Sequence, residues 1–250
     1  MVNVLISGAN GRMGKKVFEA AATSDKVGAI CGVDLVANLS ENFPIYASFN
    51  DVKEKVDVVV DFSAPSNLDN ILTFCKNKSV NAVLCATGYS EEDLKKIENA
   101  SKDIAVFRSG NMSLGINLLV DLVKKAAATL YGFDVEIIEK HHNQKVDAPS
   151  GTALMLADAV KEVDNEKFFL YGREGICGKR DKKEIGIHAV RGGTIVGEHD
   201  VIFAGNYETV TLSHQATDRS VFANGAVAAA AYLANKKSGL FNMSDVINGN

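Results

Sequence analysis

The sequence has no long apolar run and no excess of positive charge. None of its hydrophobic stretches approaches the roughly 18 residues that a membrane-spanning helix needs. Its N-terminus has neither the basic region nor the small-residue cleavage site of a secretory signal. The formal net charge of −4 disfavours nucleic acid as a partner. We therefore expect a cytoplasmic protein that binds neither membranes nor nucleic acid.

Clustered cysteines and metal-binding patterns are also missing. The four cysteines are scattered without a Cys-x-x-Cys pair, and we expect them to be reduced and buried: Cys31, Cys75, Cys85 and Cys177. No His-Glu-x-x-His pattern or cluster of acids and histidines suggests a metal ion. The chain has 250 residues and no repeat or long linker, which is enough for two small domains that share an interface.

The first part of the chain alternates apolar strands with helices, which is typical of a parallel sheet. Strands are expected at 2–7, 27–33, 56–62, 82–86 and 104–107. A glycine turn, Gly8 to Gly14, joins the first strand to a helix. Asp34 ends the second strand, about twenty residues after Gly14, where a dinucleotide-binding fold places the acid that binds the adenosine ribose. The spacing Gly-x-x-Gly-x-x-Gly is a weak signal alone, so the prediction depends on this context.

The pattern changes at residues 110–113, Gly-Asn-Met-Ser, before a long apolar helix expected at 114–130. After a strand at 133–140, we expect an antiparallel meander with turns at Gly192-Gly193 and Gly205-Asn206 and strands at 184–190, 194–204 and 207–214. An alanine-rich helix is expected at 222–235.

These elements predict an α/β protein with two domains. Residues 1–111 and 217–250 are expected to form a Rossmann-like dinucleotide-binding domain with a parallel sheet. Residues 112–216 are expected to form an α+β domain with a mixed or antiparallel sheet.

Residues 139–153, Glu-Lys-His-His-Asn-Gln-Lys-Val-Asp-Ala-Pro-Ser-Gly-Thr-Ala, lead from a strand through a loop into a helix. Asp147 or Ser150 is expected to cap this helix, leaving the N–H groups of Gly151 and Thr152 free to bind an anion. Lys145 places a full positive charge nearby. This arrangement suits an anionic substrate.

His141 and His142 are neighbours on an extended segment, so their side chains point to opposite faces and cannot bind one metal ion together. One can face a substrate and supply a proton near neutral pH. Composition alone leaves open a solvated loop with two surface histidines. Arg191 is a weaker candidate for an anionic ligand. The remaining histidines are interpreted as structural: His188, His199 and His214.

Together, residues 8–14 and 139–153 resemble the dihydrodipicolinate reductase (4-hydroxy-tetrahydrodipicolinate reductase) family of bacterial lysine and diaminopimelate synthesis. The likeness covers essentially the whole chain, and the run His-His-x-x-Lys-x-Asp-x-Pro-Ser-Gly-Thr-Ala is highly specific. The resemblance implies a homotetramer that makes tetrahydrodipicolinate from a dicarboxylate substrate with a reduced nicotinamide cofactor. Its C-terminal domain would hold the substrate and form the subunit contacts.

The resemblance also implies roles by matching position. His141 would be the general acid/base and Lys145 the catalytic cation, while His142, Gly151 and Thr152 would bind a substrate carboxylate. No metal is required. The implied cofactor site, formed largely by backbone, consists of Gly8, Ala9, Asn10, Gly11, Arg12, Met13, Asp34, Cys85, Ala86, Thr87, Gly110, Asn111, Met112 and Ser113.

Cofactor choice depends on Asp34, because its carboxylate repels the 2'-phosphate of NADPH unless a cation offsets it. Family members that accept NADPH readily often carry a basic residue next, where this chain has Leu35, and residues 34–44 contain no Lys or Arg. We predict a preference for NADH. NADPH is not excluded, since Arg12, Lys15 and Lys16 can swing toward a phosphate.

Two alternatives share parts of this pattern. Another two-domain nicotinamide-dependent dehydrogenase would have the first domain without the 141–153 run. A non-catalytic dinucleotide sensor would need a recognition helix or a basic surface, which this acidic chain does not offer.

Overall fold

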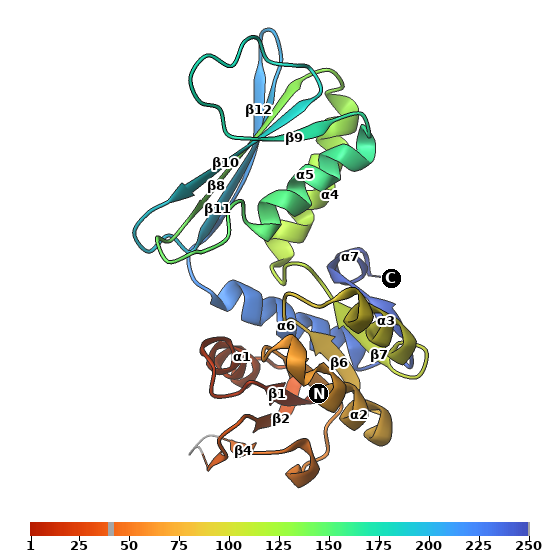
Figure 1. Cartoon of the computed structure of the whole chain (residues 1–250). Coiled ribbons are helices and arrows are strands. Elements are labelled where there is room, and N and C mark those ends of the chain that lie inside the picture. The colour runs from red at the N-terminus through yellow and green to blue at the C-terminus, as the bar shows by residue number, and fades with distance from the viewer. Residues whose placement is uncertain (40–42, 250) are drawn as a thin grey trace. The chain divides into compact units, whose positions relative to one another are not determined.

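The computed structural model describes residues 1–39 and 43–249. The chain divides into two compact units (Figure 1). The first unit comprises Met1–Leu114 and Arg219–Asn250, and the second comprises Gly115–Asp218. Each boundary falls slightly later in the chain than the sequence predicted.

The sheet of the first unit has, within the described residues, eight strands in the order β13-β7-β6-β5-β1-β2-β4-β3. All pairs are parallel except β3 with β4. Its strands are β1 (Val2–Ser7), β2 (Val27–Val33), β3 (Asn38–Leu39), β4 (Pro44–Tyr46), β5 (Val58–Asp61), β6 (Asn81–Leu84), β7 (Ala105–Arg108) and β13 (Gly239–Phe241). The short strands β3, β4 and β13 were missed by the sequence prediction.

Helices form two hydrophobic cores with this sheet because its central strands are apolar on both faces. Val58 and Val60 of β5 belong to the core that includes residues of α1 and α6, while Val59 between them belongs to the core that includes residues of α2 and α3. The fold is therefore the predicted Rossmann-like α/β arrangement. The helices of this unit are α1 (Arg12–Ala22), η1 (Phe49–Asp51), η2 (Pro65–Asn67), α2 (Leu68–Lys78), α3 (Glu91–Ala100), α6 (Ser220–Leu233) and α7 (Met243–Asn248).

The second unit contains, among the described residues, a mixed sheet of five strands in the order β12-β11-β8-β10-β9 (Figure 1). Apolar side chains of α4 and α5 share one core with inward-facing residues of this sheet, such as Val135 and Ile137 of β8. The elements are α4 (Leu114–Thr129), β8 (Asp134–His141), α5 (Gly151–Val163), β9 (Phe168–Tyr171), β10 (Glu184–Arg191), β11 (Gly197–Ala204) and β12 (Thr209–Ala216).

The predicted antiparallel meander is wrong, because β8 lies between β10 and β11. It pairs in parallel with β10 and antiparallel with β11. The Gly192-Gly193 segment therefore crosses the end of β8 instead of closing a hairpin. There Gly192 N–H donates to the His141 carbonyl at 2.9 Å, and Asn143 N–H donates to the Gly193 carbonyl at 3.2 Å. Only the Gly205-Asn206 turn joins two paired strands, β11 and β12.

The cysteines were expected to be buried, and that expectation is wrong for one of them. Cys31 and Cys75 are buried and Cys85 is half-buried, but Cys177 is exposed in the loop between β9 and β10. Burial raises the pKa of the Cys31 thiol to about 12. In the described part of the chain, no helix has the length and apolar character to cross a membrane. Nor do these residues bring together three or more His, Cys, Asp or Glu side chains that could hold a metal ion.

Candidate functional site

Strand β8 and helix α5 together position the chemical groups of the second unit. The side chains of β8 alternate between its two faces, so Glu139 and His141 continue the inward-facing row begun by apolar residues. Ser150 caps α5, its hydroxyl oxygen accepting a hydrogen bond from Ala153 N–H at 3.2 Å. The N–H of Ser150 donates to Glu139 Oε1 at 2.9 Å. One carboxylate therefore ties the end of the strand to the beginning of the helix.

The N-terminus of α5 forms a site that suits an anion. Its first turn contains no acidic residue, and its N–H groups carry the positive end of the helix dipole. Gly151 borders open space, since a Cβ built there meets no atom within 4 Å. Thr152 follows in the same turn and is half-buried. Two of the three residues expected to bind a carboxylate, Gly151 and Thr152, therefore lie at the beginning of this helix.

Glu139 is completely buried but remains ionised because of its partners. Nη1 and Nη2 of Arg191 each donate to a different Glu139 oxygen at 2.7 Å, and His141 Nδ1 lies 2.7 Å from Oε2. Burial opposes ionisation, but the hydrogen bonds from Arg191, His141 and Ser150 outweigh it and lower the pKa of Glu139. The site thus contains a charged carboxylate next to an imidazole.

His141 is 9% exposed, and its second ring nitrogen, Nε2, lies next to Gly197 at the beginning of β11. A Cβ on Gly197 would lie 3.1 Å from Nε2, so glycine at this position leaves that nitrogen uncovered. Burial lowers the pKa of His141, although the hydrogen bond to Glu139 opposes the shift. His141 is therefore mostly neutral at pH 7, with one nitrogen bonded and the other able to exchange a proton.

His199 lies beside this pair and was expected to be merely structural. Its Nε2 lies 2.9 Å from Ser150 Oγ, and its ring meets the ring of His141 edge-on at 5.2 Å. Burial, followed by the nearby His141, lowers its pKa to about 4, so it is neutral at pH 7. Its Nδ1 has no hydrogen-bond partner in the described structure.

The tautomer of His199 follows from this unpaired nitrogen. A buried N–H without a partner is rarer in proteins than a buried acceptor without one, so we assign the proton to Nε2. Ser150 Oγ then accepts hydrogen bonds from His199 and from Ala153 N–H. Its own hydroxyl hydrogen is left to donate to another group, such as a bound carboxylate.

Lys145 and His142 lie in the loop between β8 and α5. The ammonium of Lys145 is 2.8 Å from Asp147 Oδ1, and the N–H of Lys145 donates to the carbonyl of His142 at 3.1 Å. Asp147 therefore pairs with the lysine, and Ser150 alone caps the helix. The positive charge of Lys145 acts on His141, lowering its pKa after the larger effect of burial.

In the first unit, the glycine turn and Asp34 lie together. Asp34 Oδ2 accepts from Asn10 N–H at 2.8 Å, and Oδ1 accepts from Leu35 N–H at 2.7 Å. Gly8 has a φ of +78°, and a Cβ on Gly14 would collide with the Gly8 carbonyl oxygen. The turn therefore needs glycine at both positions.

A cavity of about 1060 Å³ opens beside this turn and is lined by Gly8, Asn10, Gly11 and Asp34. Helix α1 begins directly after Gly11, without a side-chain cap or an acidic residue in its first turn. Its N–H groups thus present a positive terminus without a competing carboxylate. A dinucleotide fits these residues, with its pyrophosphate at the helix and a ribose at Asp34.

The other expected cofactor residues differ in accessibility. Cys85, Ala86 and Thr87 follow β6 and are half-buried or exposed. Ala9, Met112 and Ser113 are buried. The remaining expected cofactor residues are at least partly accessible. Arg12 and Met13 begin α1, and Gly110 and Asn111 lie between β7 and α4.

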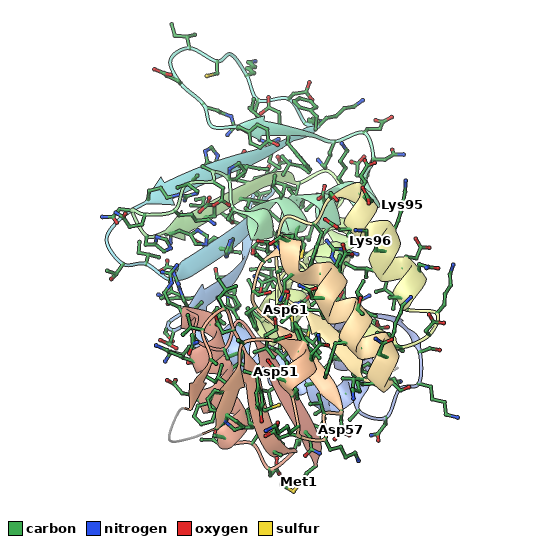
Figure 2. The ribbon with its side chains drawn as sticks, turned by 60° about the horizontal axis from the view of Figure 1, so that its bottom comes forward. Met1, Asp51, Asp57, Asp61, Lys95 and Lys96 are labelled. Atoms are coloured by element: carbon green, nitrogen blue, oxygen red, sulfur yellow. The ribbon has the colours of Figure 1, made fainter. Side chains whose placement is uncertain are left out.

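Asp61, at the end of β5, is a further buried carboxyl group in the first unit (Figure 2). Its Oδ1 accepts from the N–H and hydroxyl of Ser63, at 3.0 and 2.6 Å. Burial raises its pKa despite these bonds. Its partner Ser63 lies against the turn, since a Cβ built on Gly8 would meet Ser63 N at 3.1 Å.

Sequence reasoning gave no role to Glu139 and only a weak one to Arg191. Glu139 left a readable signal, since it lies two residues before His141 and thus on the same face of a strand. The role of Arg191 depends on its parallel pairing opposite His141, which the sequence does not reveal.

Comparison with known proteins gives a consistent result over the whole chain. The family model described as "Dihydrodipicolinate reductase, N-terminus" matches residues 2–112, and "Dihydrodipicolinate reductase, C-terminus" matches residues 115–247. The 4-hydroxy-tetrahydrodipicolinate reductase of Caldanaerobacter subterraneus subsp. tengcongensis is 51% identical, over 99% of this chain and 98% of that protein. That of Clostridium tetani is 47% identical over the same shares.

Solved structures agree with this result. The dipicolinate-bound dihydrodipicolinate reductase of Paenisporosarcina sp. TG-14 has a TM-score of 0.80 and 25% identity, covering 97% of each chain. The match to the myo-inositol 2-dehydrogenase of Lactobacillus plantarum covers 100% of this chain and 90% of that chain, with a TM-score of 0.62. At 10% identity, this match shows a shared fold alone.

Proposed function

Because this chain belongs to the dihydrodipicolinate reductase family, we propose that it reduces 4-hydroxy-tetrahydrodipicolinate to tetrahydrodipicolinate in lysine and diaminopimelate biosynthesis. It is a nicotinamide-dependent oxidoreductase. The observation that carries the proposal is the pairing of a buried, carboxylate-bound His141 with the open N-terminus of α5 in one unit. A proton donor beside an anion site is what the reduction of a dicarboxylate requires.

For the substrate, we assign one carboxylate to the beginning of α5. The N–H groups of Gly151 and Thr152 and the hydroxyl of Ser150 would bind it, with Lys145 and His142 alongside. His141 would deliver the proton from Nε2, because Nδ1 is held by Glu139. Lys145 would assist this step by stabilising negative charge.

For the cofactor, we assign the pyrophosphate to residues 8–13 at the beginning of α1 and the adenosine ribose to Asp34. The cofactor, when bound, supplies the hydride. Residues 85–87 and 110–113 would border it, largely through backbone atoms. Each oxygen of Asp34 accepts one N–H among the described contacts and has a further lone pair for a ribose hydroxyl.

We further propose that NADH is preferred and NADPH accepted. Leu35 is 95% exposed and offers no charge to a 2'-phosphate. A single ionic interaction with that phosphate would be worth about 1–2 kcal/mol, or roughly five- to thirtyfold in affinity.

The proposal includes a homotetramer assembled through the second unit and a cytoplasmic location. Phe168 and Tyr171 of β9 and Val190 of β10 support the assembly, since they are 43%, 59% and 45% exposed. Sedimentation velocity tests it, and a monomer at micromolar concentration would contradict it. The biosynthetic role supports the location.

A coupled assay tests the reaction. The upstream synthase generates the unstable substrate in place, and the loss of nicotinamide absorbance is followed with NADH and with NADPH. Oxidation that depends on the synthase product is expected with both, faster with NADH at equal concentration. No turnover with either cofactor would refute the reductase.

A further inference from the structure

The geometry points to Glu139 as a positioning residue for the reaction proposed above, on which this inference rests: clamped by Arg191, it fixes the tautomer of His141 and sustains its protonated form. Glu139 is fully buried, and its two oxygens receive two N–H groups of Arg191, the N–H of Ser150 and the Nδ1 of His141. Every hydrogen bond described for the Glu139 side chain therefore goes to another residue of the site.

The tautomer follows from the chemistry of the partners. An ionised carboxylate only accepts hydrogen bonds, so the 2.7 Å contact requires a hydrogen on His141 Nδ1. The lone pair of the neutral ring, and the acidic proton of the charged ring, are then at Nε2. This is the nitrogen that Gly197 leaves uncovered.

Arg191 keeps that carboxylate ionised. Its fork makes two parallel bonds of 2.7 Å to Glu139, a geometry that favours the charged carboxylate even in a buried place. A neutral glutamic acid could not stabilise an imidazolium in the same way. The arginine thus acts on His141 through Glu139.

The same two residues join the proton donor to the anion site. Oε1 of Glu139 holds the N–H of Ser150, and Nη2 of Arg191 donates to the carbonyl of Asp147 at 2.7 Å. Both ends of the loop between His141 and α5 are therefore fixed to one ion pair. A change at Glu139 is expected to affect proton transfer first and substrate binding second.

A matched control lies on the opposite face of the same strand. Glu136 receives both Nη groups of Arg173, at 2.9 and 2.8 Å, and Nε of Arg180 at 3.0 Å, and its Oε2 is 2.8 Å from His188 Nε2. It thus has the same partner types as Glu139. The side chains alternate along β8, so Glu136 faces away from His141. Glu136→Gln removes a comparable network without touching the proton donor.

The experiment compares Glu139→Gln, Glu139→Asp and Glu136→Gln in the coupled assay as a function of pH. For Glu139→Gln we expect kcat to fall roughly a hundredfold, the scale of a mispositioned acid/base. The rate should decline as pH rises through the pKa of His141, and this decline should move to lower pH by about one unit or more, because the carboxylate no longer stabilises the imidazolium. Glu139→Asp should recover part of the loss. Glu136→Gln should retain the wild-type kcat and pH profile.

Nuclear magnetic resonance of protein labelled with 15N-histidine gives a readout that needs no turnover. In the wild type, His141, assigned with His141→Gln, is expected to carry its hydrogen on Nδ1. A hydrogen on Nε2 in the neutral ring would overturn the inference. So would a folded Glu139→Gln variant whose kcat and pH profile match those of Glu136→Gln. Absence of turnover in the wild type with the expected tautomer would refute the proposed reaction and leave the positioning role supported.

Discussion

Arg191→Met is the substitution whose energetic effect can be worked out most fully from the structure. It removes both bonds to the buried carboxylate of Glu139 and the bond to the Asp147 carbonyl, while leaving a long, flexible side chain in place. Glu139 would then depend on His141 and Ser150 alone. Removing one partner of a buried ion pair typically costs about 3–5 kcal/mol. The Arg191 side chain is 21% exposed, so the lower figure of about 3 kcal/mol is appropriate.

The loss of stability in Arg191→Met should depend on pH, and the ionisation of Glu139 determines whether it grows or shrinks as pH falls. In the wild type its pKa is lowered below the ordinary value, so its contribution to stability is present above the unfolded pKa and is lost as pH falls through the folded pKa. Without Arg191, burial dominates and raises the pKa above the unfolded value. The variant is then penalised most at neutral and alkaline pH, and the penalty shrinks as pH falls toward the unfolded pKa of about 4.3.

Thermal unfolding followed by circular dichroism tests this reasoning. At pH 7.5 the Tm of Arg191→Met should be lower by roughly 6–12 °C, since 1 kcal/mol corresponds to about 2–4 °C in a chain of this size. At pH 5 the difference should be clearly smaller. Arg173→Met is the control, because Glu136 keeps Arg180 as a partner and lies nearer to solvent. This variant should lose about 1 kcal/mol of stability or less. A difference in Tm that is absent at pH 7.5, or that grows as pH falls, would refute the stabilising role of the ion pair.

Three further substitutions test separate parts of the site. Leu35→Arg should narrow or reverse the preference for NADH, because it supplies a cation to the 2'-phosphate of NADPH; the preference is measured as the ratio of kcat/KM values for the two cofactors at low salt. A clear preference for NADPH in the wild type would show that the positive charges of Arg12, Lys15 and Lys16 outweigh the negative charge of Asp34. Gly197→Ala should lower kcat at least tenfold, because the new Cβ would lie 3.1 Å from His141 Nε2. The affinity for NADH, measured by fluorescence titration, should not change. A normal kcat would mean that Nε2 is not the reacting nitrogen. Lys145→Ala should lower kcat roughly a hundredfold, and an effect confined to KM would assign it to substrate binding alone.

Local pattern was enough to predict the elements that carry the site. The alternation of β8, the cap at Ser150 and the strand–glycine turn–helix beginning at Val2 are properties of short segments, and each is present in the structure. Such features depend on neighbouring residues, which the sequence displays directly.

What the sequence could not reveal depends on pairing between distant segments. Arg191 reaches Glu139 only because β10 runs parallel to β8, with Arg191 opposite His141. The expected meander would have put β10 beside β11 and separated the arginine from the site. The contact of His199 with Ser150 was not foreseen for a related reason, since the two residues are 49 positions apart in the sequence. Short edge strands such as β13 bear too few residues to show a period.

The proposed role of His141 as the proton donor in a nicotinamide-dependent reduction is tested most directly by kcat of His141→Gln relative to the wild type. The coupled assay is run at pH 7 with saturating NADH, with circular dichroism to verify folding and a fluorescence titration to verify cofactor binding. We predict a fall in kcat by roughly two orders of magnitude or more with an unchanged Kd for NADH. A folded His141→Gln variant with near-normal kcat would contradict this role.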